Sequence, residues 1–340
     1  MMSVSSVDDP GPRLLEFYAG LGGVSTAWPE AHGVAAFDIN QNAQRVFEAN
    51  HDSPYWVREI ESLPIEELAQ FRADLWWLSP PCQPFTRKGM QRASEDSRSN
   101  SFERWLSKVA SCSSKLAGRL PSHIVVENVV GFEASEIAKA LKRVLQALDY
   151  RFHFVSCCPT EWGWPNRRPR VYAVATRKQF VEPIQFRFNL RADELLEKCD
   201  ESAGIAAGKT KGSLLLDVAI AKRYAEALDV VEPNSTTPAA CFTSSYGKSW
   251  VRSGSYLRFK KGDESESASE QQLRFFSPRE VSRLLGFPPT FEFAGLRDRT
   301  LWKLFGNSLA LPAVRFVLSH FENGPRTELP WWPKCECSNG

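Results

Sequence analysis

The sequence lacks any apolar run of the length that a membrane-spanning helix needs. Runs such as 75–78 and 124–126 hold three or four residues, whereas a spanning helix requires about 20. The first 12 residues are polar and acidic, and they lack the positive start and apolar stretch of a signal peptide. We therefore expect an intracellular protein without a membrane partner, placed in the cytoplasm, with the nucleus left open.

Cysteine pairs and an excess of one charge are also missing. None of the eight cysteines forms a CxxC pair, so free thiols are expected rather than a disulfide set. Cys335 and Cys337 in the tail supply only two ligands, and no metal site is predicted. The 42 basic and 40 acidic residues give a net charge of +2. Composition alone therefore does not indicate a nucleic-acid-binding protein, although a local basic cleft is compatible with it.

Short apolar runs alternate with stretches of helical spacing through the first half of the chain. Strands are expected at 14–18, 34–38, 74–79, 123–127, 152–157 and 170–176. Helices are expected from about residue 25, at 41–50 and at 133–148. This alternation predicts an α/β fold with a mostly parallel sheet covered on both faces. Ligands of such folds bind beyond the carboxyl ends of the strands.

The second half is organised differently. Residues 185–275 lack the alternation, and 94–101 and 260–272 are polar segments expected to be loops. A helical pattern returns from Ser277, and a last helix is expected at about 309–320. We predict a large domain interrupted by a smaller insert. The predicted boundaries are 10–185 for its first part, 186–275 for the insert, 276–325 for the return and 326–340 for a tail without an assigned role.

A glycine-rich turn follows the first expected strand. It contains Tyr18, Ala19, Gly20, Leu21, Gly22 and Gly23. Glycines between a strand and a helix let a ligand approach the backbone closely. Asp38 ends the next strand, where a carboxylate can hold ribose hydroxyls. The turn is not the GxGxxG of nicotinamide binders, and a purely structural turn is the alternative.

Cys82 lies in a proline-rich segment, SPPCQPF, directly after the third expected strand. Two prolines stiffen the loop, and a thiolate at a strand end is a strong nucleophile if a neighbour lowers its pKa. For an isolated cysteine, an inert buried thiol is the better interpretation. The flanking prolines and glutamine make the nucleophile hypothesis more specific.

Two further groups of polar residues stand at strand ends. Glu127 follows an apolar run, and there a carboxylic acid can bond a ring nitrogen and an exocyclic amine together, with a pKa raised by desolvation. Arg168 and Arg170 point to the same side if the chain is extended, and guanidinium groups can grip a carbonyl or orient a carboxylate. The alternatives are a solvated carboxylate and a solvated charge run.

Taken in order, these stretches resemble the motifs of the cytosine-C5 methyltransferase family. The resemblance covers about residues 14–320 and lies in Pro80-Pro81-Cys82, Glu127-Asn128-Val129, Asn166 with Arg168 and Arg170, 284–289 (LLGFPP) and 305–308 (FGNS). Asn166 replaces the glutamine of the family motif. The resemblance implies a Rossmann-like, S-adenosylmethionine-dependent fold with an inserted target-recognition domain. Cysteine after the proline pair implies methylation of carbon, because relatives that methylate nitrogen carry an aromatic residue there.

The resemblance also implies roles for individual residues. Cys82 would add to C6 of cytosine, Glu127 would bind N3 and the amino group, Arg170 would hold O2, and Arg168 would steady the acid or the loop. The base must leave its stack to reach such a pocket. S-adenosyl-L-methionine would contact the glycine turn, and the further cofactor residues are Asp38 at the ribose, Ile39 at the adenine, Glu59 and Ile60 near its far edge, and Pro80, Asn307 and Ser308.

The insert bears on the choice between RNA and DNA. Cys241, Phe242 and Thr243, with Tyr246 and Lys248, resemble the Cys-Phe-Thr motif of a branch that methylates the anticodon loop of aspartate tRNA, and 96–102 is similar to that branch. The implied function is methylation of cytosine 38 in tRNA-Asp by a monomer. The alternatives are a DNA cytosine-5 methyltransferase and an inactive nucleic-acid-binding scaffold.

Overall fold

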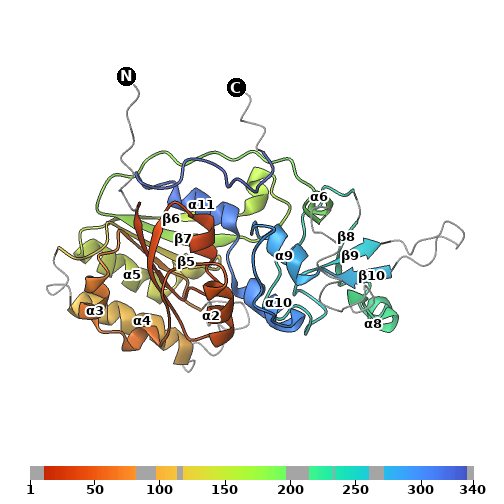
Figure 1. The fold of residues 1–340 in the computed structure, drawn as a ribbon, viewed down its shortest axis with the longest axis horizontal. Helices are drawn as coiled ribbons and strands as arrows, with labels where there is room; N and C mark the ends of the chain where they lie inside the picture. The colour runs from red at the N-terminus through yellow and green to blue at the C-terminus, as the bar shows by residue number, and fades with distance from the viewer. Residues whose placement is uncertain are drawn as a thin grey trace, which may run out of the picture. The chain divides into compact units, whose positions relative to one another are not determined.

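The computed structural model describes residues 11–81, 97–112, 118–196, 214–232, 234–259 and 272–334. The chain packs as two compact units (Figure 1). Unit 1 comprises residues 1–156, 170–184 and 315–326, and unit 2 comprises 157–169, 185–314 and 327–340. Within the described ranges, every helix is too short or too polar to cross a bilayer.

Unit 1 is built on a seven-stranded sheet of order β3-β2-β1-β4-β5-β7-β6. The strands are β1 (Arg13–Phe17), β2 (His32–Asp38), β3 (Tyr55–Val57), β4 (Leu75–Leu78), β5 (His123–Asn128), β6 (Arg151–Cys157) and β7 (Arg170–Thr176). Pairing from β3 through β5 is parallel, and β7 runs antiparallel to β5. The mostly parallel sheet predicted from the sequence is confirmed. The three-residue β3 had not been predicted.

Helices cover both faces of this sheet. They are α1 (Gly23–Ala27), α2 (Gln41–Glu48), α3 (Ile65–Gln70), α4 (Ser97–Ser111) and α5 (Glu136–Ala147). Adjacent residues of a strand point to opposite faces. In β2, Phe37 belongs to the core shared with α3, α4 and α5, whereas Ala36 packs with Phe47 of α2. The alternation of apolar side chains along the strands therefore forms two cores, one on each face.

The loop predicted at 94–101 is wrong in part, because α4 begins at Ser97. Residues 94–96 lie outside the described part of the chain. The helix is stabilised by an apolar stripe that starts just after its polar first turn. The stripe is buried and consists of Phe102, Trp105, Leu106 and Val109. Their spacing of three and four residues is that of one helix face.

Unit 2 contains a three-stranded sheet and the remaining helices. Its elements are α6 (Ala192–Leu196), α8 (Val218–Arg223), β8 (Asp229–Val231), β9 (Ser255–Phe259), β10 (Gln272–Phe275), α9 (Pro278–Leu284), α10 (Asp298–Asn307) and the start of α11 (Leu311–Leu318). The rings of Tyr246, Phe275 and Trp302 pack together within 5.5 Å. Residues 276–314 belong to the same unit as the insert. Of the segment that was predicted to return to the large domain, only residues 315–325 belong to the unit that contains the seven-stranded sheet. The predicted domain boundaries stay a prediction, because packing alone does not define a domain.

The described part of the tail is packed into unit 2. Trp331 and Trp332 both donate their indole N–H to the carbonyl of Gly286, at 3.0 and 2.8 Å. The ring of Trp332 also packs on Trp164, at 5.4 Å between centroids. The tail thus holds the turn that follows α9.

Candidate active site

The glycine turn is built from residues with left-handed backbone angles. Tyr18, Gly20 and Gly22 have φ values of 55°, 55° and 83°. A Cβ atom on Gly22 would lie 2.5 Å from the ring of His51 and 2.8 Å from that of Phe47, so only glycine fits there. The turn is open to solvent on one side, because no atom lies within 4 Å of a Cβ built on Gly20. A ligand can therefore approach its backbone.

Asp38 at the end of β2 is fixed against this turn. Its carboxylate accepts hydrogen bonds from the backbone N–H of Gly20 at 2.9 Å and of Asn40 at 3.0 Å. Burial raises the pKa of the Asp38 carboxyl. The next residue, Ile39, is 68% exposed, which is unusual for a large apolar side chain. An oriented carboxylate beside an exposed apolar side chain suits the ribose and the adenine of an adenosyl group.

The other predicted cofactor residues of unit 1 differ in accessibility. Ala19 is half-buried, and Glu59 is exposed at the start of the 3₁₀-helix Ile60–Ser62. Leu21 and Ile60 are 1% and 2% exposed. Their side chains belong to the fold, and only their backbone can contact a cofactor. Gly23 is buried at the start of α1.

A hydrogen-bonded chain that the sequence did not indicate continues from the turn. The Tyr18 hydroxyl lies 3.1 Å from the hydroxyl of Ser101 in α4, and Ser101 donates to the carboxylate of Glu61. Burial raises the pKa of Tyr18 to about 12, so its hydroxyl stays protonated at neutral pH. This series of hydrogen bonds joins the glycine turn to α4.

Glu127 and Arg170 form an ion pair at the edge where β5 ends. The Arg170 Nε lies 3.0 Å from Glu127 Oε1, and the two side chains are 16% and 11% exposed. Antiparallel pairing places Asn128 opposite Val171, so the start of β7 lies beside the end of β5. The sheet register therefore brings together two residues that are 43 positions apart in the sequence. A largely buried carboxylate fixed in this way can present a defined edge to a base.

The segment that leads to Cys82 is held at the same edge of the sheet. The Ser79 N–H donates to the carbonyl of Phe17 at 3.2 Å, and the Trp77 indole donates to the Ser79 hydroxyl at 2.9 Å. The Asn128 side chain donates to the carbonyl of Pro80 at 3.3 Å. Asn128 thus connects the Glu127-Asn128-Val129 motif to the Pro80-Pro81-Cys82 motif through Pro80. Cys82 itself, predicted as the nucleophile, lies outside the described residues.

Arg168 occupies a position different from the expected one. β7 begins at Arg170 as expected, so Arg168 precedes the strand, separated from it by Pro169, which has no N–H to pair. The Arg168 side chain is buried within unit 2 and donates to the carbonyls of Phe242 and Gly306, both at 3.0 Å, and to that of Ser308. Arg168 therefore fastens three motif segments together.

Replacing Arg168 by alanine is expected to lower the free energy of unfolding by about 3 kcal/mol or more, because several buried carbonyls lose a charged donor. Urea denaturation of the full chain measures this change. Arg167→Ala is the matched control, since the neighbouring arginine side chain is exposed. Normal stability with lost turnover would contradict this structural role and favour direct action on the acid.

The predicted substrate residues of the insert fall into two groups. Phe242 and Tyr246 are 1% and 2% exposed. The Tyr246 hydroxyl donates to the carbonyl of Ser255 at 2.7 Å and accepts from the N–H of Phe276 at 2.9 Å. The prediction that these two rings contact substrate is therefore corrected, because they form the core of unit 2.

The remaining predicted residues of unit 2 are more accessible. Cys241 and Thr243 are half-buried, and Lys248 is exposed. Asn307 ends α10 with an exposed side chain, and Ser308 is buried. Asn166 is buried and donates to the carbonyls of Ala239 and Ala240, at 3.4 and 3.2 Å.

Among the described residues, Cys112, Cys157, Cys158 and Cys241 form no disulfide bond with one another. Among these described residues, His, Cys, Asp and Glu side chains form no group of three that could hold a metal ion.

Comparison with known proteins identifies the family. The model of the C-5 cytosine-specific DNA methylase family matches residues 13–323. A tRNA (cytosine(38)-C(5))-methyltransferase of Schizosaccharomyces pombe is 30% identical over 90% of this chain and 96% of its own length. A DNA (cytosine-5)-methyltransferase of Dictyostelium discoideum is 29% identical over 90% and 93%. The crystal structure of S. pombe Dnmt2 methyltransferase superposes with a TM-score of 0.71 at 27% identity, covering 91% of this chain and 97% of that one.

These findings agree with the site. The family match spans the glycine turn, Asp38, the Glu127–Arg170 pair and the motif segments joined by Arg168. The seven-stranded sheet is that of the related methyltransferase. The chain belongs to the C-5 cytosine-specific DNA methylase family and is a cytosine-C5 methyltransferase that uses S-adenosyl-L-methionine.

Proposed function

We propose that this enzyme methylates C5 of cytosine 38 in tRNA-Asp. The observation that carries the chemistry is the Glu127–Arg170 ion pair, which lies at the same sheet edge as the Pro80 anchor of the Cys82 loop. The RNA substrate is supported by the similarity to the S. pombe enzyme, named a tRNA (cytosine(38)-C(5))-methyltransferase. Loop cytosines of folded RNA are already splayed out, so reaching such a pocket costs less than extrusion from a duplex.

The proposed reaction begins with the Cys82 thiolate. Its bond to C6 forms as the C5–C6 π bond breaks and the electron pair shifts toward C5. C5 then bonds to an electrophilic methyl group, whose former bond to the donor sulfur breaks. S-adenosyl-L-methionine supplies that methyl group when it is bound. Loss of the C5 proton and departure of Cys82 restore the double bond. The thiolate is thus regenerated, and the C5 proton is the one proton released.

The ion pair has a defined part in this scheme. The Glu127 carboxyl group binds N3 and the exocyclic amine of the base, which draws electron density away from C6 and favours thiolate addition. Arg170 fixes the acid through Nε. A guanidinium carries five N–H donors in a rigid plane, so Arg170 can also bind the O2 carbonyl of the base.

Asp38 is proposed to hold the ribose, with Ile39 against the adenine. Asp38→Asn is expected to weaken cofactor binding by about tenfold, the loss of one charge-assisted hydrogen bond. Because burial raises the pKa of Asp38, cofactor affinity is expected to fall on acidification at a higher pH than for an ordinary aspartate. Titration calorimetry across pH measures both effects. Asp52→Asn, an exposed aspartate, serves as the control, and an unchanged affinity in Asp38→Asn removes Asp38 from the cofactor site.

A DNA substrate is the second candidate, because the D. discoideum relative at 29% identity is named a DNA (cytosine-5)-methyltransferase. Purified enzyme and labelled S-adenosyl-L-methionine are offered total tRNA and duplex DNA side by side, and the products are mapped by bisulfite sequencing. Label at the anticodon-loop cytosine of tRNA-Asp is the expected result. Label in DNA alone would contradict the RNA proposal and leave the chemistry in place.

A further inference from the structure

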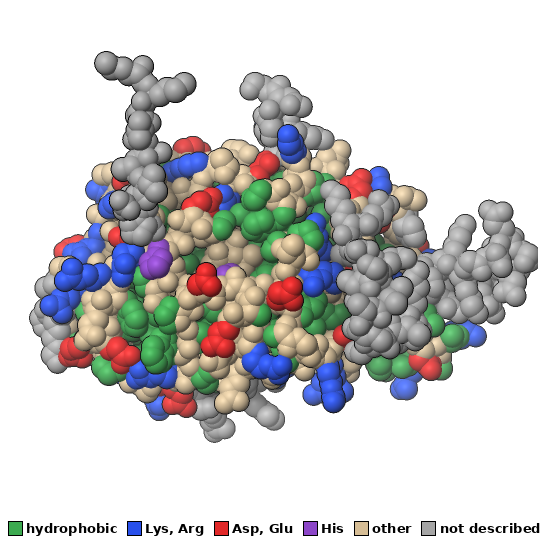
Figure 2. Space-filling view, in the orientation of Figure 1, with side chains coloured by type: hydrophobic (Ala, Val, Ile, Leu, Met, Phe, Trp, Pro, Cys, Tyr) green, Lys and Arg blue, Asp and Glu red, His purple; other side chains and the backbone are tan. Residues whose placement is uncertain are grey.

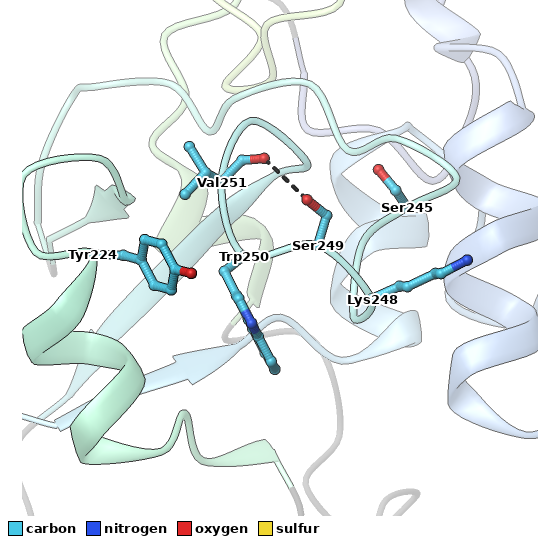
Figure 3. Close-up of a pocket in the computed structure, with 6 residues that line it drawn as sticks. All are labelled: Tyr224, Ser245, Lys248, Ser249, Trp250 and Val251. Atoms are coloured by element: carbon cyan, nitrogen blue, oxygen red, sulfur yellow. Dashed lines mark hydrogen bonds between the residues drawn. The ribbon is translucent and has the colours of Figure 1, made fainter.

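A cavity of about 510 Å³ lies within unit 2, and none of the residues proposed for catalysis lines it. It is lined by Tyr224, Ser245, Lys248, Ser249, Trp250 and Val251. Figure 3 shows the aromatic side chains of Tyr224 and Trp250 on the same side of the 245–251 loop, with Lys248 extending in another direction. The volume lies within the ~300–1,000 Å³ typical of small-ligand sites.

The loop that carries this cavity is held rigidly. A Cβ atom on Gly247 would lie 2.5 Å from the ring of Trp302, so the turn is closely packed on α10. The N–H groups of Lys248 and Ser249 both donate to the carbonyl of Ser245 at 2.9 Å. A loop fixed in advance loses little conformational freedom when it binds a ligand.

Both aromatic rings are supported from outside the cavity and are still partly exposed. The Trp250 ring packs against Phe275 at 6.0 Å between centroids. The backbone carbonyl of Trp250 accepts a hydrogen bond from the Tyr256 hydroxyl at 2.9 Å. The Arg223 guanidinium lies 5.4 Å from the centre of the Tyr224 ring. Rings supported in this way provide platforms on which a planar ligand can stack.

Four basic residues line the cavity or flank its lining residues in the chain, and one acidic residue, Glu226, follows Tyr224 by two positions. Lys248 lines it, Lys222 and Arg223 precede Tyr224 in the chain, and Arg252 follows Val251; all four side chains are exposed. Elsewhere the described surface of the face drawn in Figure 2 carries basic and acidic side chains interspersed. The net charge of +2 therefore conceals a local basic site.

We propose that this cavity, the Tyr224–Trp250 pocket, binds one unpaired nucleotide of the RNA substrate. The base stacks on the aromatic platform, and Lys248 contacts a neighbouring phosphate. Bases of a duplex are stacked and paired inside it, so only an unpaired base can enter a cavity of this kind. The inference rests on the proposed function for its ligand, and it names a substrate contact outside the reacting pocket.

Trp250→Ala tests the pocket. Fluorescence anisotropy with a labelled unpaired oligoribonucleotide is expected to show a loss of affinity of about 5- to 150-fold, the range for one stacked base. Binding to duplex RNA is expected to change by less than about twofold. With tRNA as substrate, the KM is expected to rise much more than kcat falls.

Three further variants guard against a folding defect. Trp250→Phe is expected to recover most of the affinity because it keeps a ring, and Tyr224→Ala is expected to weaken binding without removing the contact to Phe275. Lys303→Ala, an exposed lysine of α10 outside the cavity, is expected to leave binding and turnover unchanged.

The outcomes separate this inference from the proposed function. Normal RNA affinity in both Trp250→Ala and Tyr224→Ala overturns the pocket, whether or not the wild type methylates tRNA. A stronger loss for duplex DNA than for unpaired RNA overturns it as well. A wild type that methylates only DNA overturns the tRNA proposal, whereas the oligoribonucleotide measurement still decides the pocket.

Discussion

Cys82→Ala is expected to abolish methyl transfer, with a loss on the order of a thousandfold or more, while S-adenosyl-L-methionine binding stays within about twofold. C5 of cytosine is a poor nucleophile until a group adds to C6. The thiolate is the group proposed to do so, and alanine cannot replace it. Asp38 and the glycine turn, which we propose to hold the cofactor, are joined by a hydrogen bond of their own, from the Gly20 N–H to the Asp38 carboxylate.

Cofactor binding and turnover need to be measured on the same preparation. Titration calorimetry gives the cofactor affinity, and transfer of label to tRNA gives the rate. Cys112→Ala is the control, because Cys112 is a free, half-buried thiol and is expected to be dispensable. Loss of cofactor binding in Cys82→Ala would mean that the nucleophile has been misplaced.

Arg170→Ala is expected to reduce kcat by a factor of ~10²–10⁴, the range for a positioned acid–base group. The variant removes the 3.0 Å ion pair to Glu127 and the guanidinium proposed to bind O2 of the base. Arg170→Lys is expected to recover only part of the rate, because an ammonium ion cannot supply the planar set of donors.

The position of Arg170 at the start of β7 provides a control for stability. Arg177→Ala removes an exposed arginine just beyond the other end of the same strand, and it is expected to keep the wild-type rate. Thermal unfolding is measured on all three variants. A normally folded Arg170→Ala enzyme with near-normal turnover would falsify the assignment of Arg170 to the reacting pocket.

Local patterns were sufficient to predict most of the sheet. The strands β1, β2, β4, β5, β6 and β7 lie where short apolar runs were found, with ends that differ by at most two residues. Two consecutive residues of a strand face opposite sides, and a run buried on both sides is apolar throughout. The short strand β3 was missed, because its apolar run, Tyr55–Val57, has only three residues and is too short to distinguish a strand from a loop.

Helix α4 shows how a local pattern can mislead. Its first turn is serine-rich and reads as a loop, because serine competes for backbone hydrogen bonds. The apolar stripe from Phe102 to Val109 decides the structure, since its burial in the core outweighs the poor propensity of the first turn.

The amino-acid sequence alone was sufficient to predict the type of chemistry. The order and type of Cys82, Glu127 and Arg170 indicated a cytosine-C5 methyltransferase, and the family match agrees. In the sequence Cys82 comes after the strand at 75–78, Glu127 stands near the end of β5, and Arg170 begins the antiparallel β7, so the three positions belong to one edge of the sheet. The order of these residues and the apolar runs near them were therefore sufficient to predict a cytosine-C5 methyltransferase.

The surroundings of Arg168, Tyr246, Tyr224 and Trp250 became evident only from the folded structure. Arg168 bonds to carbonyls 74, 138 and 140 positions away. The Tyr246 hydroxyl forms hydrogen bonds with backbone groups 9 and 30 positions away. Tyr246, which the sequence placed in a substrate-binding motif, is therefore a core residue. Tyr224 and Trp250 share a cavity although the chain between them contains β8. These contacts join segments that are distant in the sequence. The hydrogen bonds and the packing of these side chains therefore form only when the chain folds, and local sequence patterns do not predict them.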